Sequence, residues 1–286
     1  MTLGGMRRGM RKWCGPLLLG LGLAWSMPAA QAAEAVPDTD IWLKVRESFF
    51  GSRAIRADAD EVIRLEAPYR AQDAATVPIA IRTRIPQAGA RYVRTVYLIV
   101  DRNPSPIAAI FHFTPDSGRA EIETRIRIEE YTPVRAIAEL SDGELYGSAK
   151  FVKAAGGCSA PAGKDPEAAL ARLGRMKFHL DQSVVFGEPN LAQLMISHPN
   201  HSGLAMDQMT RLFVPAYFVR TINVTYAGKP VLSAEVDFSI SENPNFRFYF
   251  VPREEGNLKA EVVDTKDLKF EYLLAVRRGI STKVTE

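Results

Sequence analysis

The chain has 286 residues, with 36 lysines and arginines against 33 aspartates and glutamates, for a formal net charge of +3. Four of the basic residues and none of the acidic ones fall in the first 32 positions, so the rest of the chain carries 32 basic and 33 acidic residues. This near-neutral balance excludes a nucleic-acid-binding role based on net charge. A hydrophobic content of 47% is ample for packed cores in one large or two ordinary domains.

Residues 1–32 have the layout of a secretory signal peptide. A basic start, Arg7–Lys12, precedes the apolar stretch Pro16–Trp25, and Ala30–Ala32 supplies small residues for cleavage. The apolar run is shorter than the roughly 20 residues that span a membrane. The basic start also resembles a twin-arginine signal, so the general secretory and twin-arginine routes both remain open. The sequence predicts export to the periplasm.

A helix is predicted over Ile41–Phe50, because apolar residues recur there at helical spacing. Ile41, Trp42, Val45 and Phe49 are expected to share its buried face, and residues 38–40 offer N-caps.

Alternating apolar and polar residues then predict short antiparallel strands separated by turns, which is typical of a β-sandwich. These strands are expected at 77–85, 91–100, 108–113, 120–128, 134–140 and 145–152. Within 120–128, Arg125 and Arg127 are expected on the solvated face.

The middle of the chain breaks this alternation. Gly156, Gly157 and Cys158 open a flexible stretch, and Asp165-Pro166-Glu167 begins a short helix that runs to about Met176. A second set of strands is predicted at 191–198, 216–226, 231–238, 245–251, 258–263 and 269–276. The predicted fold class is therefore mainly β, with two β-sandwich domains joined by a Gly-Gly-Cys linker and a short helix.

Cys158 is the one cysteine outside the signal, since Cys14 lies within it. A thiolate attacks sulfur and the bond it forms can later be reversed, so a thiol on a mobile arm is a natural covalent carrier of sulfur species. We expect Lys150, Lys153 and Lys164 to lower the pKa of this thiol and to attract an anion. Two alternatives stay open: an incidental linker cysteine, and a cysteine that forms an intermolecular disulfide.

Other chemistry receives little support from the sequence. His198 and His201, with Met195, Met206 and Met209 nearby, could bind copper or zinc, but two histidines three apart are a weak signal, and we predict no metal and no cofactor. Because the chain has no nucleophile-elbow serine, phosphate loop or dinucleotide fingerprint, we do not expect an enzyme.

The first half followed by Phe151–Cys158 resembles SoxY, the sulfur-carrying subunit of the bacterial thiosulfate-oxidising system. The second half resembles its partner SoxZ. The short matches on which the SoxZ resemblance rests are His198-Pro199, Gly203-Leu204, Pro215–Phe218, Tyr226–Lys229, Leu232–Ala234 and Asn243-Pro244. Taken together, the chain is similar to the fused SoxYZ-like carriers that accompany periplasmic quinoprotein dehydrogenases.

The resemblance implies two immunoglobulin-like domains, a SoxY-like domain at 33–152 and a SoxZ-like domain at 178–286, joined by a thiol-bearing linker at 153–177. It also implies that Cys158 is the attachment point and that Gly156 and Gly157 form the hinge of the arm. In SoxY the cysteine lies in a Gly-Gly-Cys-Gly-Gly tail, whereas here Ser159-Ala160-Pro161 follows it. This arm is therefore tethered at both ends and must enter a partner as a hairpin.

Two hypotheses follow. In the first, the protein is a periplasmic carrier that holds an anionic sulfur compound on Cys158 and presents it to sulfur-oxidation enzymes. In the second, it is a non-catalytic accessory module that binds a quinoprotein dehydrogenase or its cytochrome, and the cysteine is dispensable. Neither hypothesis includes a nucleic-acid partner or a membrane span.

Overall fold

The computed structural model describes Met1 and residues 36–57, 60–161, 166–180 and 183–278. The chain from Val36 onward forms one compact unit, to which the following description applies. Apart from Met1, the predicted signal peptide lies outside the described residues, as does Lys164.

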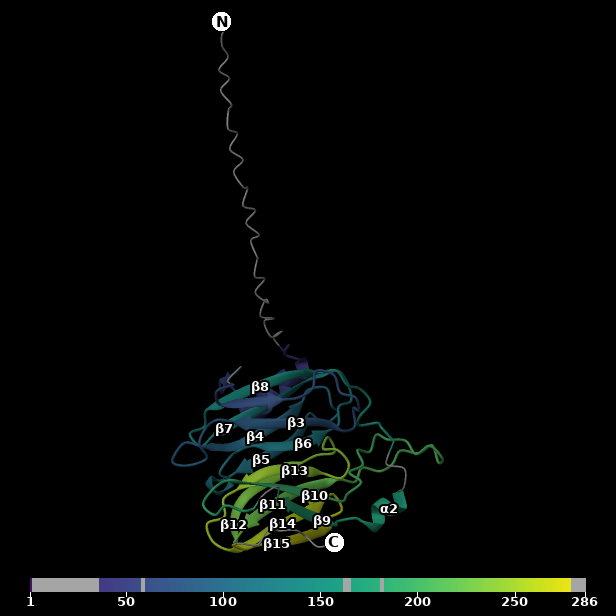
Figure 1. The fold of residues 1–286 in the computed structure, drawn as a ribbon. Coiled ribbons are helices and arrows are strands. Elements are labelled where there is room, and N and C mark those ends of the chain that lie inside the picture. Colours follow the sequence, from purple (N-terminus) through teal and green to yellow (C-terminus); the bar gives the residue numbers. More distant parts are fainter. Residues whose placement is uncertain (2–35, 58–59, 162–165, 181–182, 279–286) are drawn as a thin grey trace. The chain divides into compact units, whose positions relative to one another are not determined.

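Two β-sheets face each other and enclose the core (Figure 1). The larger sheet has nine strands in the order β1 (Ile55–Arg56), β8 (Leu145–Val152), β7 (Thr132–Leu140), β4 (Val93–Val100), β5 (Ile107–Phe113), β12 (Lys229–Val236), β11 (Val219–Tyr226), β14 (Gly256–Asp264) and β15 (Lys269–Val276). The smaller has six, in the order β2 (Ile63–Glu66), β3 (Val77–Thr83), β6 (Ile122–Ile126), β13 (Asn245–Phe250), β10 (Asn190–Ile196) and β9 (Met176–Leu180).

Both sheets run without interruption from the first half of the chain into the second. In the larger sheet β5 pairs antiparallel with β12, and in the smaller sheet β6 pairs antiparallel with β13. One hydrophobic cluster includes residues of both halves, and the rings of Phe111 and Phe246 meet within it at 6.2 Å. The mainly-β prediction is confirmed. The division into two domains stays a prediction, while the strand pairing makes the halves parts of one continuous sandwich.

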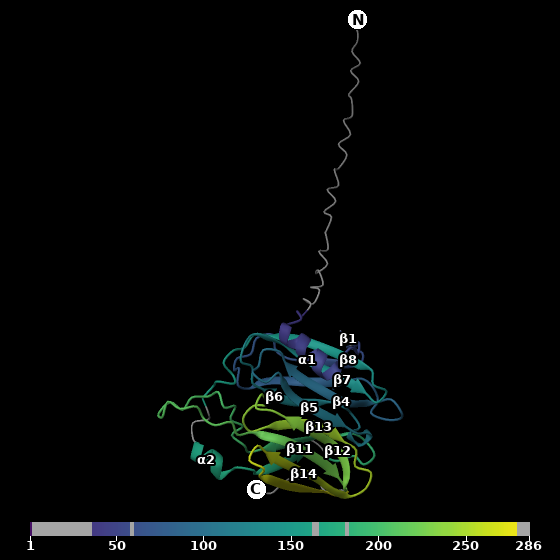
Figure 2. The ribbon, with the colours of Figure 1, turned by 180° about the vertical axis from the view of Figure 1, so that it is seen from behind.

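Helix α1 (Asp40–Phe50) packs on the outer face of the larger sheet (Figure 2). Thr39 caps it by accepting a hydrogen bond from the Trp42 amide at 3.0 Å. Trp42 and Phe50 are its buried residues, and they contact β4, β7 and β8 through Ile99, Ile137 and Leu145. The predicted face was wrong for Ile41 and Phe49, which are exposed, because the helix turns Phe50 toward the sheet instead.

Helix α2 (Pro166–Ala171) is shorter than predicted. The chain turns at Gly174, whose φ is +73°, and enters β9 at Met176, where the sequence interpretation still placed helix. The short strands β1 and β2 and a 3-10 turn at Pro115–Ser117 were not predicted from the sequence. Most of the other strands begin and end within a few residues of their predicted positions.

Candidate functional site: a sheltered cysteine loop

Residues 154–160, called here the thiol loop, follow β8 and carry Cys158. The loop lies along the chain that leaves β6: the Gly157 amide donates to the Ile128 carbonyl at 2.9 Å, and the Gly156 amide donates to the Glu129 carbonyl at 2.8 Å. Cys158 is only 1% exposed. The sequence predicted a thiol displayed on an open arm, and the structure instead places the thiol inside the protein.

Both glycines are needed for this docked conformation. Gly156 has φ +80°, a left-handed conformation that other residues adopt only with strain. A Cβ atom on Gly157 would lie 2.0 Å from the Ala74 carbonyl oxygen, so no side chain fits there. The glycines predicted as a hinge therefore also let the thiol loop approach the sandwich closely.

The Glu129 carboxylate holds the thiol loop at its tip. It accepts hydrogen bonds from the Cys158 amide at 2.9 Å, from the Ser159 amide at 3.1 Å and from the Ser159 hydroxyl at 2.9 Å. Glu129 is itself fixed, because its amide donates to Oδ1 of the buried Asn103 at 2.9 Å. Bonds to an ionised acceptor are stronger than neutral ones, so this carboxylate is the main clamp on the loop.

The second half of the chain supplies a further clamp. The buried Ser202, in the segment between β10 and β11, donates its hydroxyl hydrogen bond to the Cys158 carbonyl oxygen. The same hydroxyl oxygen accepts from the Leu204 amide at 3.1 Å. The thiol loop is therefore held from both halves at once.

Burial raises the pKa of the Cys158 thiol to about 12. The neighbouring charges are Glu129 and Asp237, which raise the pKa further, and Arg127, which opposes them. In this position the thiol is neutral at any physiological pH.

The expectation that lysines lower this pKa is not met. Lys150 and Lys153 are not among the charges that shift it, and the Lys153 ammonium lies over the Tyr69 ring at 4.7 Å. Lys164 lies outside the described residues. Nearness in sequence misled the prediction, because the residues that face the thiol come from strand ends and loops elsewhere in the chain.

Arg127 is a site residue that the sequence analysis misassigned. It was expected on a solvated strand face, but it is 8% exposed. Its guanidinium donates to the carbonyls of Phe238 at 2.9 Å and Ile240 at 2.7 Å. Burial lowers its pKa, and the electrostatic interaction with Cys158 opposes this shift. Strand alternation could not reveal the chain segment that covers this arginine.

The two histidines considered as metal ligands have other surroundings. Nδ1 of His198 accepts from the Asn200 amide at 3.0 Å, and Nε2 faces Oδ2 of Asp264 at 3.5 Å. Both side chains are fully buried, and burial lowers the pKa of His198 to about 4, against the opposing effect of Asp264. Burial also lowers the pKa of His201. In the part of the chain that the structure describes, no three His, Cys, Asp or Glu side chains gather as a metal site.

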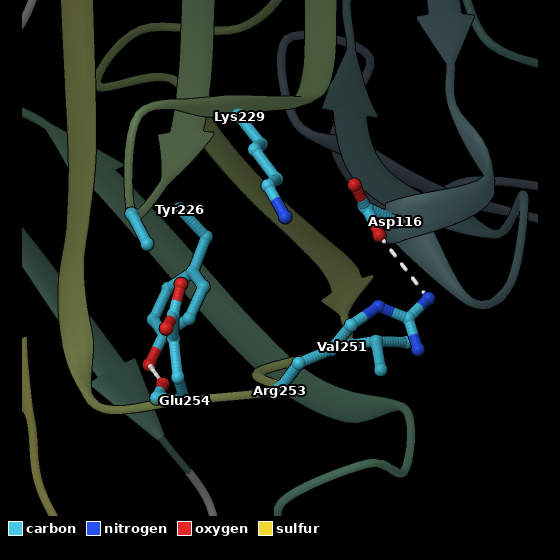
Figure 3. A pocket seen from close by; sticks show the side chains of 7 residues that line it. Asp116, Tyr226, Lys229, Val251, Arg253 and Glu254 are labelled. Carbon is cyan, nitrogen blue, oxygen red and sulfur yellow. Dashed lines mark hydrogen bonds and ion pairs between the residues drawn. The ribbon is translucent and has the colours of Figure 1, made fainter.

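A separate small hollow lies at the other end of β12, where Lys229 begins the strand (Figure 3). Lys229 points into it, Arg253 pairs with Asp116 at 3.2 Å, and the Tyr226 hydroxyl donates to the Glu254 carbonyl. Asp237, which faces the thiol, follows the opposite end of β12. This hollow is therefore not part of the cysteine site.

Fold and site together define a two-sheet β protein that holds one thiol on the loop between its halves. Among the described residues, no helix is long and apolar enough to cross a membrane. A family model described as "Sulfur oxidation protein SoxY" matches residues 46–158 and so ends on Cys158 itself. The model described as "Sulphur oxidation protein SoxZ" matches residues 178–274. The chain thus carries SoxY and SoxZ domains in tandem and belongs to the fused SoxYZ-like sulfur-oxidation carriers.

Solved structures give weaker likenesses. The sulfur carrier protein SoxY from Chlorobium limicola f thiosulfatophilum is 25% identical over 40% of this chain and 94% of its own, with a TM-score of 0.33. A superoxide reductase (neelaredoxin) from Ignicoccus hospitalis is 14% identical over 35% of this chain and 94% of its own, with a TM-score of 0.31. Among curated proteins no relative matches.

Proposed function

We propose that the protein is a periplasmic carrier, not an enzyme, that holds an anionic sulfur compound covalently on Cys158 and presents it to sulfur-oxidation enzymes. The observation that carries this proposal is the position of the single thiol: the SoxY family match runs up to it, and the thiol loop is held by a few hydrogen bonds between the two halves. Export by the signal in residues 1–32 would deliver the carrier to the periplasm.

The chemistry needs a partner that accepts electrons. Joining Cys158 Sγ to the outer sulfur of a compound such as thiosulfate forms one S–S bond, releases the thiol proton and releases two electrons. A partner cytochrome would take up those electrons. The bond can be broken again when a later enzyme removes the cargo, since thiol–sulfur bonds are reversible.

This function requires two positions of the thiol loop. In the docked position the thiol is buried and neutral, so it does not react. Release from Glu129 and Ser202 would swing Cys158 outward, with Gly156 and Gly157 as the hinge. Lys150, Lys153 and Lys164 would then support the thiolate and its anionic cargo on the released loop.

Mass spectrometry of the intact protein from periplasmic extract tests the proposal. A reducible adduct of thiosulfate or sulfur on Cys158, absent from a Cys158→Ser variant, is the expected result. A thiol that stays unmodified while cells oxidise thiosulfate, together with full function of Cys158→Ser, would refute the carrier role.

The burial of Cys158 and its raised pKa favour a second candidate function. In this alternative the protein is an accessory module that binds a periplasmic quinoprotein dehydrogenase or its cytochrome, and the cysteine is a core residue. Pull-down with the dehydrogenase separates the two: binding and activity unchanged by Cys158→Ser support the accessory role, and their loss supports the carrier.

A further inference from the structure

Residues 204–214 form an exposed apolar hairpin between β10 and β11. Met209 is 93% exposed, Leu212 68%, Phe213 62% and Met206 44%. In both ribbon views a green loop of this part of the chain projects beyond the sheets (Figures 1 and 2). Ordered apolar side chains gathered on one projecting feature mark an interaction surface.

Hydrogen bonds within the hairpin fix a conformation in which these side chains are exposed to solvent. The Asp207 amide donates to the Leu212 carbonyl and the Val214 amide to the Ala205 carbonyl, both at 2.9 Å. At the tip, Oδ1 of Asp207 accepts from the amides of Met209 at 3.0 Å and Thr210 at 2.7 Å. The exposure is therefore a property of a framed turn and not of a frayed segment.

The hairpin adjoins the thiol loop. Ser202, two residues before the hairpin begins, donates to the Cys158 carbonyl, and its hydroxyl oxygen also accepts from Leu204, the first hairpin residue. One side chain thus contacts both features. A protein that binds the hairpin would lie next to Cys158 and could disturb the hydrogen bond from Ser202 to the thiol loop.

We propose that the apolar hairpin is the docking surface for the partner enzymes that act on Cys158, which would offer an apolar recess beside the opening of their active sites. The proposal rests on the carrier function proposed above. A carrier must visit more than one enzyme, and methionine side chains adapt to differently shaped partners. An anionic membrane fits less well, because Asp207 and Arg211 are the only charges at 204–214 and leave no net positive charge.

Photo-crosslinking of the full chain in its own cells tests this. A photoreactive residue is placed at Met209, at Ser159 beside the thiol, and at Leu273 on β15, which is 49% exposed and serves as the control. We expect the same protein or proteins to be captured from positions 209 and 159, and none of them from position 273. Capture of lipid only, of a second copy only, of no protein shared by positions 209 and 159, or of nothing at 209 overturns the proposal.

Binding of the captured protein, once purified, gives the second measurement. Met209→Asp and Phe213→Asp together should weaken it about 100-fold, roughly tenfold for each apolar anchor, while Leu273→Asp leaves it unchanged. An equal loss of binding in Leu273→Asp would refute the hairpin as the docking surface. The Cys158 adduct is measured separately in the same cells. A selective crosslink with an unmodified Cys158 would refute the proposed carrier function and leave the hairpin as a docking surface. An adduct on Cys158 without the crosslink would refute the hairpin as the docking surface and leave the carrier function.

Discussion

Replacing Glu129 by Gln should release the thiol loop and expose Cys158. The carboxylate accepts three hydrogen bonds from Cys158 and Ser159, and glutamine keeps one acceptor oxygen of similar shape without the charge. Hydrogen bonds to charged groups contribute about 1 kcal/mol more than neutral ones. Because Glu129 is half-buried, solvent screens part of this, and we expect a net loss of about 1.5 kcal/mol in the docked state. That corresponds to a roughly tenfold larger open population.

The rate of Cys158 modification by a disulfide reagent such as DTNB measures the open population. With its pKa raised from 9.0 to about 12, the docked thiol has about a thousandfold less thiolate at pH 8 than a free one, so reaction proceeds through the open loop. Glu129→Gln should react about tenfold faster than the parent protein. Glu130→Gln is the matched control, because Glu130 is exposed and its ion pair among the described residues is with Arg102, at 3.5 Å.

The pH dependence supplies a second check. The docked, neutral thiol is the main state, and only the open loop forms the reactive thiolate, so the rate of the parent protein should keep rising about tenfold per pH unit above pH 9, where a free thiol levels off. Glu129→Gln should react about tenfold faster than the parent protein at each pH on this rise. A parent rate that levels off near pH 9, or equal rates for Glu129→Gln and Glu130→Gln, would refute the clamp.

Three further predictions concern the same structure. Gly157→Ala should abolish docking of the thiol loop and raise the DTNB rate at least 100-fold, because its Cβ would meet the Ala74 carbonyl oxygen. Gly156→Ala introduces strain without a clash and should destabilise the docked loop by about 1 kcal/mol. Equal effects of the two variants would contradict the steric argument. Ser202→Ala leaves the Cys158 carbonyl without this donor and should raise the rate about tenfold; an unchanged rate would show that Ser202 does not hold the loop. Burial lowers the pKa of His198 from 6.5 to about 4, so between these pH values the unfolded state binds more protons than the folded state. The free energy of unfolding, measured with urea, should therefore fall by up to about 3 kcal/mol as the pH drops from 6.5 to 4. His198→Gln should flatten this loss, and an equally steep loss in the variant would assign it to other groups.

The strands were predictable because one face of each is buried. Residues 245–250 alternate between buried and partly exposed positions, and this period of two is written directly in the sequence. The pairing of β5 with β12 was not predictable, since it joins residues more than a hundred positions apart and no local pattern specifies it. For the same reason the sequence indicated two sandwiches and could not show that they share both sheets.

The candidate site divides in the same way. Cys158 and its two glycines could be found from composition and spacing alone. Their docked position could not, because it depends on Glu129, Ser202 and Ala74, which lie far from the thiol loop in sequence. A run of glycines gives the backbone freedom, and only tertiary contacts decide whether that freedom is used for motion or for close packing.

The docked environment of Cys158 favours a neutral thiol over a negatively charged group on Sγ. The difference of about three units between the ordinary and the docked pKa corresponds to about 4 kcal/mol against a negative charge at this position. An anionic adduct on Sγ meets the same burial and the same carboxylates of Glu129 and Asp237, and among the described residues Arg127 opposes them. The Glu129 and Ser202 clamps hold the loop with an energy of similar size. In a carrier of this design, loading the thiol with an anion would itself drive the loop outward, and removal of the cargo would let it dock again.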